Sequence, residues 1–190
     1  MDTIGIGLIG TGFMGKSHAL AFRAVKAAFG DVPTPRLELL CAPSAATAAQ
    51  FGAQFGFDRS TGDWRSLVRD PRVDVVAITT PNAWHRPMAL EAIAHGKAVY
   101  CEKPMASNLD DAEAMADAAA RAGVPTMVGY NYLHNPAVTH AKALIDAGAI
   151  GRCHAFGVVM ATTSTRGSRT KERQSPVLRS KPNCAPNCAA

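Results

Sequence analysis

Three glycines near the start of the chain have the spacing of a turn that binds a dinucleotide pyrophosphate. The turn Gly10-Thr11-Gly12-Phe13-Met14-Gly15 directly follows the apolar stretch 4–9. In a G-x-G-x-x-G turn the first glycine allows a tight bend and the second lets the backbone approach the phosphates. The third lets the following helix pack closely on the strand. This spacing therefore indicates anion binding by backbone N–H groups.

Two further polar segments follow apolar stretches. Thr79-Thr80-Pro81-Asn82, with His85 three residues on, comes after the stretch 73–78, and Glu102-Lys103-Pro104 comes after the stretch 97–101. In a parallel sheet whose strands alternate with helices, ligands gather at the carboxyl ends of the strands. Both polar segments are therefore predicted to lie at the same sheet edge as the glycine turn.

The elements that must position these residues alternate along the chain. A helix over 13–29 follows the first strand, because apolar residues recur there among alanines without a proline. Further strands are predicted at 37–41, 73–78, 97–101 and 124–129, and helical segments at 44–55, 63–68, 82–95 and 107–122. Ser107 or Asn108 is the expected cap of the last helix. This succession predicts an α/β fold, a doubly wound parallel sheet of the Rossmann type.

Composition and charge exclude several classes of protein. The chain of 190 residues is 47% hydrophobic and 18% charged, which is typical of a globular protein. No apolar run approaches the ~20 residues of a membrane span, and the N-terminus lacks a signal-peptide pattern, so a cytoplasmic protein is expected. The net charge of +5 comes from residues 161–190, since residues 1–160 hold 14 basic and 14 acidic residues. No basic face for nucleic acid is expected.

The five cysteines are interpreted as reduced residues rather than disulfide partners. Cys41 and Cys101 each end an apolar strand, and Cys153 lies near another. Cys184 and Cys188 have no second ligand pair nearby, so no metal site is predicted.

The order of these segments resembles the Gfo/Idh/MocA family of oxidoreductases. The resemblance extends from about Ile4 to about Met160 and rests on the glycine turn and on three further segments. These are Thr80-Pro81-Asn82-Ala83-Trp84-His85, Gly96-Lys97-Ala98-Val99-Tyr100-Cys101-Glu102-Lys103-Pro104 and Gly129-Tyr130-Asn131-Tyr132. The resemblance implies an NAD(P)-dependent dehydrogenase acting on a secondary hydroxyl of a sugar, polyol or inositol-like substrate.

The resemblance also implies roles for individual residues. Lys103 is expected to move the hydroxyl proton, because hydride transfer from an alcohol needs a positioned base. The Lys103–Pro104 bond is expected to be cis, and Glu102 to fix this loop and the cofactor end by hydrogen bonds. His85 either faces the cofactor or caps its helix, and Asn131 is expected near the substrate. The expected cofactor-binding residues are Gly10, Thr11, Gly12, Phe13, Met14, Gly15, Ser44, Thr80, Pro81, Asn82, His85, Glu102 and Lys103.

Two positions depart from the family pattern. The segment Cys41-Ala42-Pro43-Ser44 contains no acid to hold the adenosine ribose, and no arginine follows closely for a 2′-phosphate. Ser44 is the only nearby side-chain partner, so the choice between NAD and NADP stays open. Leu133 stands where many relatives have arginine.

The predicted domains are a Rossmann domain over 1–129, the start of an α+β substrate domain over 130–160, and an atypical basic tail over 161–190. A helix over 135–147 and a strand over 153–160 would begin the second domain. The tail loses apolar periodicity and is expected to be disordered. We interpret it as the result of an interrupted gene or reading frame near residue 160. The alternative is a natural basic tail that binds acidic partners.

Two other functions are alternatives to a dehydrogenase. A non-catalytic nucleotide-binding remnant would bind cofactor without turnover, since most of the substrate domain is missing. An S-adenosylmethionine methyltransferase also has a glycine turn, but the Glu102-Lys103-Pro104 segment has no role there. Relatives often form homo-oligomers through the second domain, of which this chain is expected to contain only the first strand.

Overall fold

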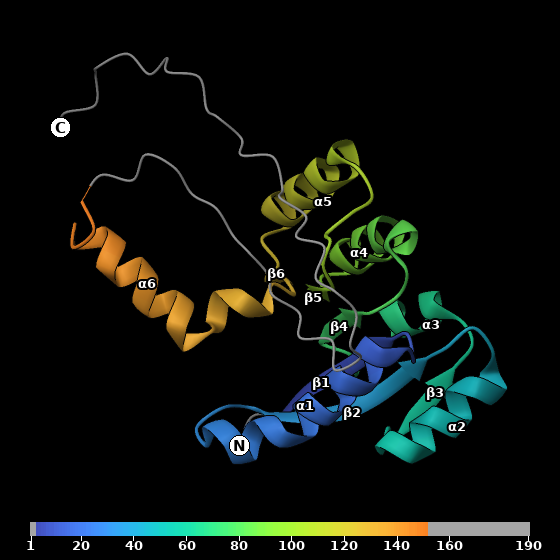
Figure 1. Ribbon diagram of the computed structural model, residues 1–190. Helices are drawn as coiled ribbons and strands as arrows, with labels where there is room; N and C mark the ends of the chain where they lie inside the picture. The colour runs from blue at the N-terminus through green and yellow to red at the C-terminus, as the bar shows by residue number, and fades with distance from the viewer. Residues whose placement is uncertain (1–2, 152–190) are drawn as a thin grey trace, which may run out of the picture. The chain divides into compact units, whose positions relative to one another are not determined.

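The strands form one parallel sheet in the computed structural model, which describes residues 3–151 (Figure 1). Within these residues the sheet has six strands in the order β3-β2-β1-β4-β5-β6. They are β1 (Thr3–Ile9), β2 (Thr34–Cys41), β3 (Arg59–Thr61), β4 (Val75–Ile78), β5 (Ala98–Cys101) and β6 (Thr126–Val128). All neighbouring strands pair in parallel. Because β1 lies between β2 and β4, the chain progresses outward on both sides of β1, and the predicted doubly wound sheet is confirmed.

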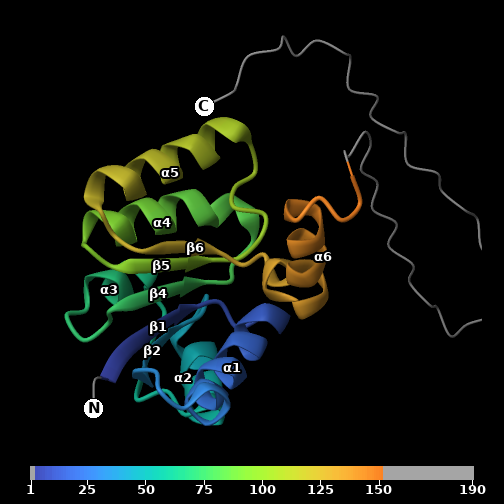
Figure 2. The ribbon, with the colours of Figure 1, turned by 90° about the vertical axis from the view of Figure 1, so that its left-hand side faces the viewer.

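The helices cover both faces of the sheet, which explains why the central strands β1 and β4 are apolar on both sides. The helices of this sheet unit are α1 (Phe13–Phe29), α2 (Ala45–Phe55), α3 (Trp64–Arg69), α4 (His85–Ala94) and α5 (Leu109–Ala122). One core cluster contains residues of α1 and α2, and the other contains residues of α3, α4 and α5. Figure 2 shows α4 and α5 on one side of the strands and α1 and α2 on the other.

The helix ends agree with the capping signals in the sequence. Ser44 accepts a hydrogen bond from the backbone N–H of Thr47 at the start of α2, and Asn108 accepts one from Asp111 at the start of α5. Gly123 ends α5 in the left-handed conformation. The helix predicted over 82–95 is divided into a 3₁₀ turn, Asn82–Trp84, and α4. Strand β3, which is short and polar, was not predicted.

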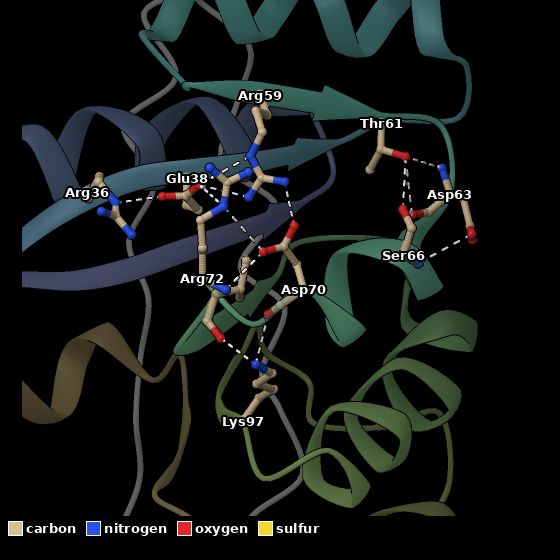
Figure 3. Close-up of polar contacts among 10 residues, drawn as sticks. Arg36, Glu38, Arg59, Thr61, Asp63, Ser66, Asp70, Arg72 and Lys97 are labelled. Carbon is tan, nitrogen blue, oxygen red and sulfur yellow. Dashed lines mark hydrogen bonds and ion pairs between the residues drawn. The ribbon is translucent and has the colours of Figure 1, made fainter.

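A bulge in β2 places a glutamate inside the protein. Ile6 of β1 pairs with Leu37 and Gly7 pairs with Leu39, so Glu38 is an extra residue in the ladder. The Glu38 side chain is 2% exposed and lies among three arginines (Figure 3). Its carboxylate is 2.5 Å from Arg36 Nε, 2.7 Å from Arg59 Nη2 and 3.2 Å from Arg72 Nε. These four residues, the Glu38 cluster, join β2 to β3 and to the connection before β4.

The chain divides into two compact units between Tyr132 and Leu133. The second unit contains α6 (Pro136–Asp146), which confirms the predicted helix over 135–147. Asn135 caps α6, and Pro136 occupies its first turn. The predicted strand 153–160 and the predicted tail 161–190 lie outside the described residues, and the proposed domain limits stay predictions. No helix within residues 3–151 has the length and apolar character needed to cross a membrane.

Candidate dinucleotide-binding site

A groove of about 610 Å³ lies at the carboxyl ends of β1, β2 and β4. The glycine turn forms one part of its wall and the residues after β4 form another. The lining residues are Ile9, Gly10, Thr11, Gly12, Phe13, Met14, Cys41, Ala42, Pro43, Gly62, Trp64, Thr79, Thr80, Pro81, Trp84 and Met88. The groove thus lies where the strand order changes direction, the usual ligand position in doubly wound sheets.

The three glycines of the turn have different surroundings. Gly10 has a φ of +110°, which other residues rarely adopt. A Cβ on Gly15 would lie 2.2 Å from the carbonyl oxygen of Gly10, so α1 approaches the turn too closely for any side chain there. A Cβ on Gly12 would meet no atom within 4 Å. Gly10 and Gly15 are therefore needed by the fold itself, whereas the space beside Gly12 is open.

The start of α1 is suited to an anion. Gly12 is its N-cap and offers no side chain to the free backbone N–H groups, and the first turn contains no acidic residue. The helix dipole places partial positive charge at this end. Open backbone donors, the space beside Gly12 and the absence of acids fit a pyrophosphate, so the residues present fit a dinucleotide.

His85 connects the two polar segments that follow β4 and β5. Its side chain is fully buried, and it lies with Nε2 2.8 Å from the Thr80 carbonyl oxygen and Nδ1 3.0 Å from the Pro104 carbonyl oxygen. His85 does not line the groove, and its geometry is that of a link between the loops.

Glu102 holds the backbone of the loop that contains Lys103. Oε2 of Glu102 accepts a hydrogen bond from the Lys103 N–H at 3.1 Å, and Oε1 lies 2.7 Å from His18 Nε2 of α1. Glu102 is buried, whereas the Lys103 side chain is exposed. The Lys103–Pro104 bond is cis, as the family resemblance implied. The buried Glu102 carboxylate therefore fixes the backbone of this loop, while the Lys103 side chain remains exposed.

Other predicted site residues lie apart from the groove wall. The Ser44 hydroxyl is engaged in capping, with Thr47 N at 3.2 Å and Thr47 Oγ1 at 2.9 Å. Asn82 is exposed in the 3₁₀ turn after β4, and Asn131 is exposed in a 3₁₀ turn, Asn131–His134. Cofactor contacts of Ser44 and Asn82 and a substrate contact of Asn131 stay predictions.

The groove also contains residues that the sequence did not single out as ligands. Trp64 and Gly62 follow β3, and Trp84 and Met88 follow β4. Trp84 belongs to a segment already recognised, so its position after a strand was the signal that could have identified it. Trp64 and Gly62 carried no such signal, because β3 itself has no apolar pattern.

The thiols of Cys41 and Cys101 are expected to resist alkylation in the folded protein at pH 8. Both are buried and free, which confirms the prediction for these two, while the other three cysteines lie outside the described residues. Burial raises the pKa of Cys41 to about 12, with a further contribution from Asp63, and burial followed by Glu102 raises that of Cys101 to about 12. Because the thiolate is the reactive nucleophile, both thiols react slowly at a pH below their raised pKa values.

Peptide mapping by mass spectrometry after iodoacetamide treatment, with and without urea, measures this protection. Equal labelling rates at either cysteine in the two conditions would contradict it.

A parallel sheet with a glycine turn at its switch point defines a dinucleotide-binding Rossmann domain. Residues 4–130 match the Gfo/Idh/MocA family, described as an oxidoreductase family with an NAD-binding Rossmann fold. The match covers more than half of the chain, so the protein belongs to this family and has its NAD-binding fold.

The similar proteins include several sugar and inositol dehydrogenases. Levoglucosan dehydrogenase of Pseudarthrobacter phenanthrenivorans is 42% identical over 157 residues, which cover 82% of this chain and 40% of the relative. The scyllo-inositol 2-dehydrogenase (NAD(+)) of Bacillus subtilis is 31% identical and covers 76% of this chain and 41% of its own length. This chain spans about 40% of the length of these relatives.

Solved structures of oxidoreductases are also similar to this chain. An NAD binding oxidoreductase from Klebsiella pneumoniae has a TM-score of 0.76 and 49% identity, covering 78% of this chain and 40% of that one. Levoglucosan dehydrogenase in complex with NADH and L-sorbose has a TM-score of 0.77 and 42% identity, covering 80% of this chain and 41% of that one.

Proposed function

We propose that this protein is an NAD(P)-dependent dehydrogenase that acts on a secondary hydroxyl of a sugar, polyol or inositol-like substrate. The observation that carries the proposal is the groove beside the open glycine turn, whose wall includes the residues after β4. The names of the similar proteins, among them levoglucosan and inositol dehydrogenases, support the substrate class.

The proposed chemistry needs one group to remove a proton. A bound nicotinamide would supply the hydride acceptor. The hydroxyl proton must leave as the hydride moves, and Lys103 is the proposed acceptor of that proton through its exposed amine in the neutral form. Glu102 holds the Lys103 backbone at 3.1 Å, and His85 joins Pro104 to Thr80, whose loop lines the groove. Glu102 and His85 are therefore positioning residues in this proposal.

The experiment that tests the proposal begins with calorimetric titration of the chain with NADH and with NADPH. Saturable binding of at least one is expected. A folded chain that binds neither contradicts the proposed function. Oxidation of a panel of sugars, polyols and inositols with NAD⁺ and NADP⁺ then tests turnover. Binding without turnover of any hydroxyl favours the alternative, a nucleotide-binding protein that does not catalyse hydride transfer.

Lys103→Met tests the proposed proton acceptor. Turnover is expected to fall about 100-fold or more, because positioned acid–base catalysis contributes factors of that order, and this loss should exceed any change in NADH binding. Lys142→Met is the matched control, since this lysine lies on α6 and pairs with Asp146 on the same helix. Equal turnover of the Lys103→Met variant and wild type would contradict the assignment.

A further inference from the structure

The end of β2 contains no acid that could distinguish the two nicotinamide cofactors. The adenosine ribose of a dinucleotide is usually held beside this strand end by Asp or Glu. Here the groove is lined by Cys41, Ala42 and Pro43, and the hydroxyl of Ser44 already caps α2. Discrimination against a 2′-phosphate therefore requires a group from another element.

Strand β3 brings a second loop to the same place. Cys41 pairs with Thr61 in the β2–β3 ladder, and the Ala42 N–H donates to the Thr61 carbonyl oxygen at 3.3 Å. The next residue, Gly62, lies so close to the start of α2 that a Cβ on it would be 3.0 Å from Ala45 N. The loop after β3 therefore packs directly on the loop after β2.

Asp63 lies on this loop between two residues of the groove wall. Gly62 and Trp64 both line the groove, whereas Asp63 itself and the neighbouring Arg65 do not. Arg65 places its guanidinium over the Trp64 ring, with 4.3 Å between its Cζ and the ring centroid. Asp63 thus places an exposed carboxylate on the loop beside the groove, between two residues that line it.

The Asp63 carboxylate is held in place by short-range hydrogen bonds. Oδ1 accepts from the Arg65 N–H at 3.0 Å. Oδ2 accepts from the Ser66 N–H at 3.3 Å (Figure 3). The Asp63 N–H donates to Thr61 Oγ1 at 3.1 Å. The negative charge of Asp63 also contributes, after burial, to the raised pKa of the Cys41 thiol at the end of β2.

We propose that Asp63, supplied by the loop after β3, disfavours a 2′-phosphate and makes this protein prefer NAD(H) to NADP(H). The inference rests on the proposed function, because it concerns the adenosine end of the same groove. A fixed carboxylate beside the groove repels a dianionic 2′-phosphate, whereas the ribose hydroxyls of NAD carry no charge.

Asp63→Asn separates the charge of this residue from its capping role, because asparagine is as good an N-cap as aspartate. The wild type is expected to bind NADH more tightly than NADPH. The ratio of the two dissociation constants is expected to shift toward NADPH by about fivefold in the variant, which corresponds to ~1 kcal/mol. The shift should shrink at high salt, since exposed charges are screened.

Asp58→Asn is the matched control, because Asp58 is also exposed and precedes β3 at its opposite end. Asp63→Ser, another capping residue, replaces the first variant if that one is unstable. An unchanged ratio in the Asp63 variants, an equal shift in the Asp58 variant, or a wild type that prefers NADPH overturns the inference and leaves the proposed function standing. A folded wild type that binds neither cofactor overturns both.

Discussion

Alanine at position 12 is expected to weaken NADH binding about tenfold or more, a loss of ~1.4 kcal/mol, with little change in the free energy of unfolding. The backbone of Gly12 has a φ of −69°, which alanine adopts freely, and a Cβ would meet no atom within 4 Å. The added methyl group would instead occupy the space through which a pyrophosphate approaches the backbone. Calorimetric titration with NADH and urea unfolding measure the two quantities.

Gly15→Ala is the contrasting control. Its Cβ would lie 2.2 Å from the Gly10 carbonyl oxygen, so the turn or α1 must move. We expect a loss of about 3 kcal/mol in unfolding free energy, the upper end for overpacking. If Gly12→Ala bound NADH like wild type, or destabilised the protein as much as Gly15→Ala, the open space beside Gly12 would not be the pyrophosphate position.

Glu38→Gln is expected to lower the free energy of unfolding by about 3 kcal/mol. The carboxylate faces Arg36, Arg59 and Arg72, and its removal leaves three guanidinium groups with one fewer counter-charge. Breaking a buried ion pair typically costs ~3–5 kcal/mol. We expect a loss at the lower end of this range, because the three arginines are partly exposed and can be hydrated.

Urea unfolding followed by circular dichroism measures this loss. Glu113→Gln is the matched control, since Glu113 is exposed on α5, and a surface substitution of this kind usually changes stability by less than ~0.5 kcal/mol. Equal stabilities of the two variants would mean that the Glu38 cluster does not hold β2, β3 and the connection before β4 together.

The glycine turn and the strand ends were predictable because their signals are local. Gly10 and Gly15 mark positions where a side chain is excluded by the fold, and such positions can be read from residue type alone. The apolar stretch that contains β4 has no polar alternation, since helices cover both of its faces. Asn108 and Gly123 bound α5 through capping preferences that act over a few residues.

The features that could not be predicted from the sequence depend on contacts between residues that are far apart in the chain. Strand β3 consists of Arg59, Ser60 and Thr61, which have no apolar periodicity and form a strand only because β2 offers an edge. The burial of Glu38 depends on arginines from three segments. The link made by His85 requires both loop carbonyls to be in place, which no local pattern reveals.

The two tryptophans are positioned as intrinsic fluorescence probes of the groove. The chain contains only Trp64 and Trp84, both in the first compact unit, and both line the groove. Their intrinsic fluorescence therefore follows the unfolding of the Rossmann domain and does not register α6, which has no tryptophan. A reduced nicotinamide cofactor in the groove would accept excitation energy from either indole. A single optical signal can thus report cofactor occupancy and the integrity of the domain that provides it.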